Sequence, residues 1–341
     1  MSIQISDCTI RDGGYLANKN FAPEFINGVI RGLILAGIDY IETGFLQDKV
    51  SGEAIVYKNS TDVRKYIPQY TGNSAFVGFC DNSRYSVSNL DNCDGKSFNN
   101  LRVSFAKHEW KEALRFCAAA KEKGYKVFVQ PMDASGYNVA ERRELIAAVN
   151  DIMPEAFAIV DTFGVMHLYE LREIFNQVDV LLDKKIKVGL HTHNNLNLSN
   201  ALVEQLVDMS VETERSVSVD GSLMGMARGA GNACTEVIAH FLNTKYGKNY
   251  NIPVLIETIE KYILPLKITT HWGYDIPMFI CGATSAHVDN ISYLTKNTDC
   301  NYKKMYEVIE SMSPDKRKRY GVNYSKSDFA ALKKALEKSL R

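Results

Sequence analysis

The sequence predicts a TIM (β/α)₈ barrel followed by a helical C-terminal extension. Short apolar runs alternate with segments of helical period from Ile3 onward, which is typical of repeated βα units and a parallel sheet. Eight such runs fit into about 245 residues, the usual size of a (β/α)₈ barrel. A doubly wound open sheet shows the same alternation and is the structural alternative. We assign residues 1–248 to the barrel and residues 249–341 to the extension.

Eight apolar runs are the predicted barrel strands, and each is short enough for one pass through a barrel wall. By residue number they are 3–9, 39–43, 75–80, 101–105, 126–130, 156–161, 187–191 and 216–220.

Helical periodicity fills most of the intervals between these runs. The first helix begins near Pro23, and Gly37 and Gly124 stand where the chain must turn from a helix back to a strand. The interval 81–100 is polar and has no convincing helical stripe, so the sequence leaves open a short helix or a rim loop.

The pattern changes after about residue 249, where the βα alternation ends. Residues 254–266 have the period of an amphipathic helix that Pro265 interrupts, and residues 272–280 are aromatic and rich in turn formers. Helical periodicity resumes over 302–312 and 329–340. We expect this extension to pack on the barrel or on another subunit.

Composition narrows the class of protein. Hydrophobic residues make up 45% and charged residues 23%, as in an ordinary soluble globular protein. Forty basic residues balance forty acidic ones, so the charge indicates neither a nucleic-acid nor a membrane partner. No apolar run approaches the length of a membrane span.

The cysteines and the N-terminal stretch bear on the compartment. Seven cysteines are scattered without a C-x-x-C pair, which is typical of reduced thiols in a cytoplasm. The chain enters an apolar strand pattern at once, without the features of a secretory signal. We therefore expect a cytoplasmic protein.

Two histidines one residue apart end the seventh predicted strand. Successive side chains of a strand point to opposite faces, so His191 and His193 share one face. Alone, this pair fits a solvated edge or a hydrogen-bonded rim equally well. In a barrel, however, the C-terminal ends of the strands form the active site.

Other strands deliver polar residues to the same end. The first delivers Arg11 and Asp12, the second Glu42 and the sixth Asp161. A surface turn or rim hydrogen bonds are the structural alternatives for these residues. As functional residues they would be exposed or paired, because an isolated buried charge is costly.

Asp12, His191 and His193 together supply one carboxylate and two imidazoles, a set suited to a divalent cation with open positions for substrate. Such mixed ligation fits Mn²⁺, Mg²⁺, Co²⁺ or Zn²⁺, and we favour Mn²⁺ or Mg²⁺ because water and substrate oxygens would complete the coordination. The glycine-rich loop that contains Gly229 and Gly231 is either a flexible connection or a cradle for a phosphate or carboxylate, and we favour the cradle.

Four segments carry a family resemblance: Ile10-Arg-Asp-Gly, Asp161-Thr-Phe-Gly, His191-Thr-His-Asn and Gly229-Ala-Gly-Asn. They resemble the signature segments of the DRE-TIM metallolyase superfamily, and most of all its 4-hydroxy-2-oxoacid aldolases, such as 4-hydroxy-2-oxovalerate aldolase. The resemblance covers about residues 3–245. It implies a lyase that cleaves or forms a 4-hydroxy-2-oxo acid, with pyruvate as the common product or donor.

The resemblance also implies roles for single residues. Asp12, His191 and His193 would be metal ligands, and Asn232 a ligand or a close neighbour of the metal. Arg11 would stabilise the enolate oxygen of pyruvate, since it adds positive charge where negative charge develops. By the same resemblance, Glu42 and Asp161 would lie near the metal and its waters.

One position departs from the aldolases. They usually have a histidine two residues after the Arg-Asp-Gly segment, as the base toward the 4-hydroxyl group, and this chain has Tyr15 there. The ordinary pKa of tyrosine, about 10, makes it a poor base at neutral pH. Tyr274 and His287 in the extension are the other candidates, although a surface position is the simpler interpretation of His287.

Two further functions stay open. A Claisen-type enzyme that condenses or cleaves an acyl-CoA is the first, although the isopropylmalate-synthase-like branch usually continues the Arg-Asp-Gly segment with Glu-Gln. The hydroxymethylglutaryl-CoA-lyase branch has a cysteine in its glycine-rich lid, whereas Cys234 here follows Asn232. The second is a non-catalytic metal-binding partner subunit. The extension would then suit a homo-oligomer or a dehydrogenase-like partner.

Overall fold

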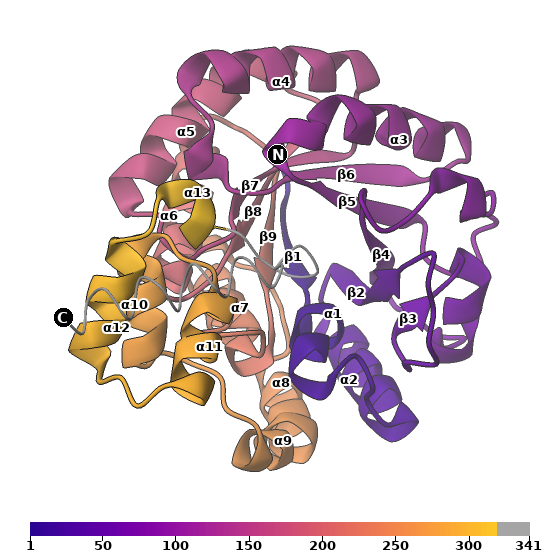
Figure 1. The fold of residues 1–341 in the computed structure, drawn as a ribbon. Coiled ribbons are helices and arrows are strands. Elements are labelled where there is room, and N and C mark those ends of the chain that lie inside the picture. Colours follow the sequence, from indigo (N-terminus) through magenta and orange to yellow (C-terminus); the bar gives the residue numbers. More distant parts are fainter. Residues whose placement is uncertain (319–341) are drawn as a thin grey trace.

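A computed structural model of the protein describes residues 1–318, in which eight parallel strands close into a barrel (Figure 1). Strand β1 pairs with β9 on one side and with β2 on the other, which closes the sheet. All eight predicted strands are confirmed, and β3 (Val56–Tyr57) adds a short pairing to β2. The barrel strands are β1 (Ile3–Asp7), β2 (Tyr40–Leu46), β4 (Ala75–Asp81), β5 (Asn100–Phe105), β6 (Lys126–Pro131), β7 (Ala156–Asp161), β8 (Lys187–Thr192) and β9 (Val217–Gly221).

Side chains along each strand point alternately into the barrel and outward to an apolar face that the helices cover. Inside, Tyr40, Val77, Phe128 and Ala156 form a small cluster near the strand starts. Outside, strand side chains such as Leu101 pack in the main core between sheet and helices. The interior is therefore filled near the strand starts, and polar side chains occupy it near the strand ends.

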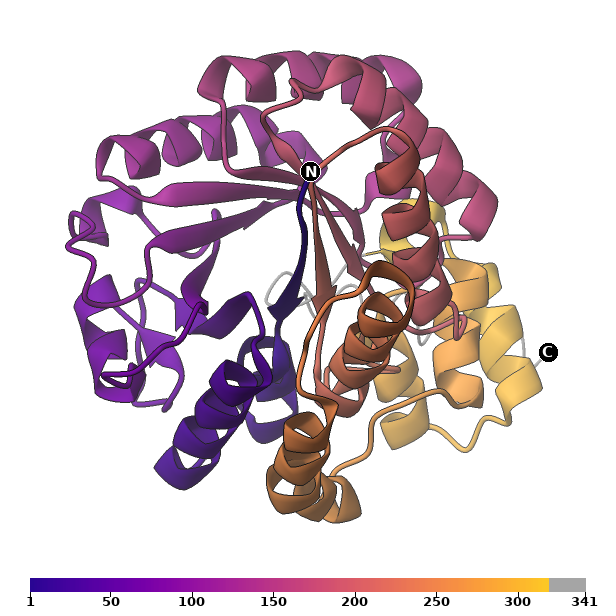
Figure 2. The same ribbon diagram turned by 180° about the vertical axis from the view of Figure 1, so that it is seen from behind.

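Helices surround the barrel, as the view from behind also shows (Figure 2). Gly37 ends α2 with a φ of 81°, which permits the turn back to a strand. The outer helices are α2 (Pro23–Ala36), α3 (Trp110–Glu122), α4 (Val139–Ile152), α5 (Leu168–Leu181), α6 (Ser199–Glu212) and α7 (Thr235–Tyr246).

Short helical turns connect the remaining parts of the barrel. The crossovers after β2 and β4 have the 3₁₀ turns η2 (Ser60–Tyr66) and η3 (Val87–Asn89) in place of a long helix, so the polar interval 81–100 is a loop with one turn. The other short helices are α1 (Thr9–Gly13), η1 (Gly14–Ala17), η4 (Lys107–Glu109), η5 (Ala134–Gly136) and η6 (Leu223–Gly225).

The C-terminal extension packs in two parts. Helix α8 (Ile252–Thr258), the π-helical turn η7 (Ile259–Ile263) and α9 (Leu264–Thr269) follow the barrel, and Leu255 and Ile263 belong to the barrel core. Ile280, Leu294 and Val308 instead form part of a second apolar core within the later helices. These are α10 (Ile276–Thr284), α11 (Val288–Asn297), α12 (Tyr302–Glu310) and α13 (Pro314–Arg317), gathered at one side of the barrel in Figure 1.

Several expectations for the extension are not decided by this packing. The predicted helix at 329–340 lies outside the described residues, and the boundary at residue 248 and the proposed partners stay predictions. Among residues 1–318, no helix combines the length and apolar character needed to cross a membrane. All seven cysteines are free thiols.

Candidate active site

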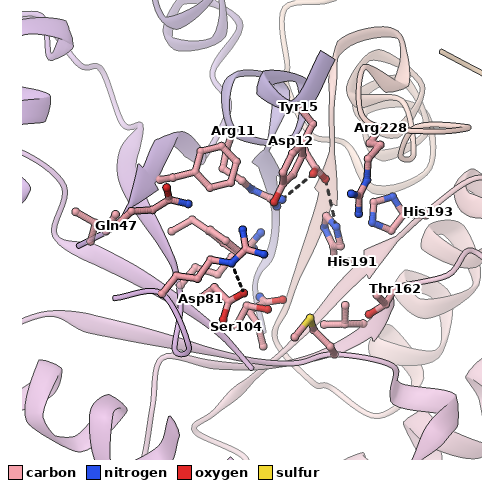
Figure 3. Close-up of a pocket in the computed structure, with 18 of the residues that line it drawn as sticks. Arg11, Asp12, Tyr15, Gln47, Asp81, Ser104, Thr162, His191, His193 and Arg228 are labelled. Atoms are coloured by element: carbon pink, nitrogen blue, oxygen red, sulfur yellow. Dashed lines mark ion pairs between the residues drawn. The ribbon is translucent and has the colours of Figure 1, made fainter. Parts of the chain in front are cut away.

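A cavity of about 250 Å³ opens at the C-terminal ends of the barrel strands (Figure 3). Its walls come from all parts of the barrel and from the extension, and they include four arginines. Its lining residues that matter for chemistry are Arg11, Asp12, Tyr15, Phe79, Asp81, Arg84, Arg102, Thr162, His191, His193, Arg228 and His287.

Arg11 and Asp12 lie on α1, the single helical turn that directly follows β1. The Arg11 Nε atom donates to Glu42 Oε2 at 2.5 Å, and Nη1 lies 2.8 Å from Asp12 Oδ1. The guanidinium carbon lies 4.5 Å from the centroid of the Phe79 ring. Two carboxylates and one aromatic face thus fix the orientation of Arg11 at the cavity wall.

The two histidines share one face, as the strand period predicts, and both line the cavity. Their ring centroids lie 5.1 Å apart, and the rings are nearly perpendicular. One ligand atom each from Asp12, His191 and His193 lie within 4.8 Å of one another. This spacing allows one metal ion to contact all three.

Electrostatics distinguish the members of this group. Burial alone would raise the pKa of Asp12, but Arg11 and His191 hold it well below its usual range. Burial also acts against charge on His191, yet its contacts with Asp12 and Asp220 raise its pKa to about 9. Burial lowers the pKa of His193 to about 4. The negative charges of Asp12 and Asp220 favour a proton on His191, and they would attract a divalent cation to the same place.

Asn232 adds an observation that fits a metal. Its Nδ2 donates to Asp12 Oδ2 at 2.8 Å, whereas its Oδ1 is buried and has no hydrogen-bond partner in the described chain. A buried carbonyl oxygen without a donor is unfavourable. The donor set therefore suits a divalent cation held by Asp12, His191 and His193, with Asn232 Oδ1 as a further oxygen ligand.

A second group of donor atoms, on Cys8, His191 and Asp220, suits a metal less well. Burial raises the pKa of the Cys8 thiol well above its usual value, which disfavours the thiolate that binds metals. Asp220 is already engaged, because it accepts hydrogen bonds from Arg102 at 2.7 and 2.8 Å.

Arg102 and Asp220 join the ion pairs of the candidate site, although no motif in the sequence indicated them. Arg102 also forms an ion pair with Glu42, and Asp220 lies 2.9 Å from Nδ1 of His191. Asp220 therefore orients the proposed ligand His191, and Arg102 links it to Glu42 and through it to Arg11. One signal was present in the sequence, namely a charged residue inside an apolar strand, since such a residue needs a buried partner.

Asp161 does not line the cavity, so the structure does not bring it to the candidate site with the histidines. Its strand neighbours Val160 and Thr162 do line the cavity, and the strand period therefore directs Asp161 to the other face. There its carboxylate accepts the N–H groups of Val165 and Met166 at 3.0 and 3.2 Å. Asp161 thus holds the loop that follows β7.

Gly229 and Gly231 shape their loop but do not line the cavity. Both have positive φ, 68° and 83°. A side chain on Gly231 would collide with the backbone oxygen of Gly225. The member of this loop that lines the cavity is Arg228, which the sequence analysis did not select.

The extension contributes one of its two candidate residues. Tyr274 is 49% exposed and does not line the cavity, so the structure does not bring it to the site. His287 is buried at the start of α11 and lines the cavity, and its Nε2 accepts a hydrogen bond from Arg228 at 2.9 Å. Burial and the charge of Arg228 lower its pKa to about 2. The surface interpretation of His287 is therefore wrong.

Tyr15 also lines the cavity, at the position where the aldolases usually have a histidine. Burial raises the pKa of its phenol above the usual value, against the effect of nearby arginines. Tyr15 can therefore donate a hydrogen bond, but it is not ionised at neutral pH.

Residues 97–260 match the model of the HMGL-like family. This span is just under half of the chain and is similar to that family. The match includes Asp161, both histidines and the Gly229–Asn232 segment, and it confirms the resemblance inferred from the motifs. Arg11 and Asp12 lie outside it, but the fold joins them to the histidines.

Curated proteins similar to this chain agree with that resemblance. A 4-hydroxy-2-oxovalerate aldolase of Bacillus thuringiensis is 25% identical over 275 residues, which cover 77% of this chain and 76% of the relative. An oxaloacetate decarboxylase of Mycobacterium tuberculosis is 25% identical over 252 residues, 71% of this chain and 70% of the relative.

Solved structures share the fold. The N-terminal domain of a candidate aldolase from Bacteroides vulgatus superposes with a TM-score of 0.73 at 23% identity, over 86% of this chain and 97% of that one. An HMG-CoA lyase of Bacillus subtilis superposes with a TM-score of 0.63 at 18% identity, over 78% of this chain and 94% of that one. These structural similarities support the barrel fold.

Proposed function

We propose that this protein is a divalent-metal-dependent aldolase that cleaves or forms a 4-hydroxy-2-oxo acid through the enolate of pyruvate. The grouping of Asp12, His191 and His193 within 4.8 Å, beside Arg11 on one cavity wall, carries the proposal. Mn²⁺ or Mg²⁺ is our preferred cation, and when bound it supplies Lewis acidity toward the 2-oxo and carboxylate oxygens of the substrate.

Arg11 adds positive charge to the same cavity wall. It has little freedom to move, because Glu42 and Asp12 both accept from its guanidinium group. A fixed cation stabilises a developing enolate oxygen without the cost of reorienting during the reaction. The Arg102–Asp220 pair behind Glu42 and His191 holds this arrangement in place.

His287 is our candidate for the base that takes the proton of the 4-hydroxyl group. It is unprotonated at neutral pH, and Nε2 is the ring atom that faces Arg228. The charge of Arg228 weakens this base, so a substrate group that neutralises Arg228 would strengthen it. Tyr15, whose phenol stays protonated, serves as a hydrogen-bond donor in this scheme.

The first experiment follows the methyl protons of pyruvate in D₂O, with and without Mg²⁺ or Mn²⁺, with EDTA added before each NMR spectrum. We expect exchange that requires the metal and is lost in His191→Ala and Arg11→Gln. Arg64→Gln is a matched control, since Arg64 forms a surface ion pair with Asp94 away from the cavity. Absence of exchange from a protein shown to bind the metal would contradict the proposal.

Decarboxylation of oxaloacetate is a second candidate, because it also yields the enolate of pyruvate and needs no base. Tyr15 in place of the usual histidine favours it, as does the relative named for that reaction. His287→Gln separates the two functions. We expect it to abolish aldol cleavage, whereas decarboxylation would survive in an enzyme that needs no base.

The acyl-CoA alternative has less support. Cys234 does not line the cavity, and burial raises the pKa of its thiol to about 12. Likeness to HMG-CoA lyases concerns the fold alone. Activity that requires a thioester substrate would favour this alternative, and full activity of the purified chain would exclude a purely structural role.

A further inference from the structure

The four arginines of the cavity fall into two pairs by depth. The side chains of Arg11 and Arg102 are 6% and 3% exposed, and each contacts two carboxylates. Those of Arg228 and Arg84 are 41% and 35% exposed, and their ion-pair partners lie 3.8 Å and 3.6 Å away. The protein's own carboxylates therefore neutralise the inner pair closely and the outer pair only loosely.

Arg228 lies beside Tyr15, and Arg84 lines the same cavity. The guanidinium carbon of Arg228 lies 5.1 Å from the centroid of the Tyr15 ring, and Lys19 Nζ lies 5.9 Å from the same centroid. The charges of Arg228, Arg11 and Arg84 all act to lower the pKa of this phenol. Three arginines and Lys19 thus outnumber Asp12 among the charged groups near Tyr15, and its hydroxyl group can donate to an anion.

Two of the proposed metal ligands, Asp12 and His191, lie deeper than the outer arginines. Their side chains are only 3% and 7% exposed, against 41% for Arg228 and 35% for Arg84. The 2-oxo acid end of a substrate that binds there leaves its other end toward the mouth, where Arg228 and Arg84 stand. A charged group at that far end would meet opposite charge.

We propose that Arg228, Arg84 and Tyr15 form an anion subsite, and that the substrate is a 4-hydroxy-2-oxo acid with a second carboxylate at the end remote from the metal ligands. This inference rests on the proposed aldolase function and names the substrate class for it. Guanidinium groups bind carboxylates in a planar, two-bonded geometry, so arginine suits this task better than lysine.

The reaction balances for the simplest such diacid, 4-hydroxy-2-oxoglutarate. The 4-hydroxyl group gives its proton to the base, and its oxygen becomes the aldehyde oxygen of glyoxylate. The C3–C4 bond breaks, and its electron pair forms the enolate of pyruvate. A proton then adds to C3 and yields the pyruvate methyl group, so no further reactant is needed.

Arg228 also connects this subsite to the candidate base. It donates to His287 Nε2 at 2.9 Å and belongs to the loop that contains Gly229 and Gly231. A substrate carboxylate paired with Arg228 would neutralise the charge that acts on His287. The second carboxylate of the diacid would therefore speed the proton transfer to His287 as well as strengthen binding.

The test compares 4-hydroxy-2-oxoglutarate with 4-hydroxy-2-oxopentanoate, which lacks the second carboxylate, by kcat/KM for pyruvate release. We expect the unmodified protein to prefer the diacid at least about tenfold, and Arg228→Gln to lower its kcat/KM about 10- to 100-fold more than that of the monoacid. Arg84→Gln has the same effect in a weaker form. Arg228→Lys restores part of the preference because it keeps the charge.

Arg64→Gln is the control, because the Arg64 side chain is 40% exposed, close to the 41% of Arg228, yet lies outside the cavity. It should leave the preference unchanged. A preference for the monoacid, or equal losses for both substrates in Arg228→Gln, would overturn the subsite. Pyruvate proton exchange without cleavage of either compound would also overturn it, yet would leave the enolate step standing. Absence of metal-dependent exchange would instead remove the proposed function itself.

Discussion

Asn232 Nδ2 donates a hydrogen bond of 2.8 Å to Asp12 Oδ2, across 220 residues of sequence. The other end of the same amide, Oδ1, is buried and lacks a hydrogen-bond partner within residues 1–318. An amide that is satisfied at one end only points to a missing positive group at the other end. A cation beside Asp12 would supply it.

Replacing Asn232 with alanine should therefore weaken Mn²⁺ binding by about 10- to 100-fold, as loss of a supporting ligand usually does. Isothermal titration calorimetry measures this directly. Asn150→Ala is the control, because the Asn150 amide bonds the backbone at Leu181 and Asp183 and does not line the cavity. Equal affinities of Asn232→Ala and the unmodified protein would show that Asn232 does not assist the metal.

Arg102→Met should destabilise the fold by about 3 to 5 kcal/mol, because it leaves the buried carboxylates of Glu42 and Asp220 without a common cation. Urea unfolding at pH 7 measures the change. Arg64→Met removes a surface ion pair and should cost at most about 1 kcal/mol. A loss in Arg102→Met no larger than that in Arg64→Met would contradict the proposed bridging role.

Gly231→Ala should be more destabilising than Gly247→Ala, although both glycines have positive φ, 83° and 64°. The added methyl group collides with the backbone oxygen of Gly225 in the first case and meets nothing within 4 Å in the second. The positive φ alone costs about 1 kcal/mol in each. Melting temperatures and Mn²⁺ affinity report the difference, since Asn232 is the next residue. Similar results for both variants would show that the loop adapts.

The sequence alone predicted those features that depend on the local alternation of apolar and polar residues. Eight apolar runs predicted eight strands, and the alternation along β8 predicted that His191 and His193 share a face. The same alternation, applied to β7, would have turned Asp161 away from the cavity, because Val160 and Thr162 flank it. Motif similarity outweighed the period at that point, and the period was correct.

Long-range pairing was not predictable in the same way. Arg102 and Asp220 come from β5 and β9, and only barrel closure brings their side chains together. Arg228 lies in the loop that we expected to cradle a ligand, but no motif singled it out, because its neighbours are alanine and glycine. Its cavity position depends on the backbone path of that loop and on His287 of the extension. No local pattern contains that information.

Asp7 should make stability depend on pH, independently of the metal site. Burial raises its pKa to about 6, although Thr235 and Thr9 donate hydrogen bonds to its carboxylate at 2.6 and 2.9 Å. In the unfolded chain the pKa is about 3.9. The folded state therefore favours the protonated form. Its stabilising contribution is complete below about pH 4 and is lost as the pH rises through about 6.

Ionisation of Asp7 lowers the free energy of unfolding by about 3 kcal/mol in total, and roughly half of this loss falls between pH 5 and pH 7.5. Asp7→Asn cannot ionise and so lacks this dependence. From pH 5 to pH 7.5, the free energy of unfolding of the unmodified protein should fall by roughly 1 to 1.5 kcal/mol more than that of Asp7→Asn. Urea unfolding measures both. The contributions of the other titrating groups to this pH dependence cancel in the comparison, because both proteins contain these groups. Parallel stability curves would mean that Asp7 keeps an ordinary pKa in the fold, and a curve that rises with pH would mean that its hydrogen bonds outweigh its burial.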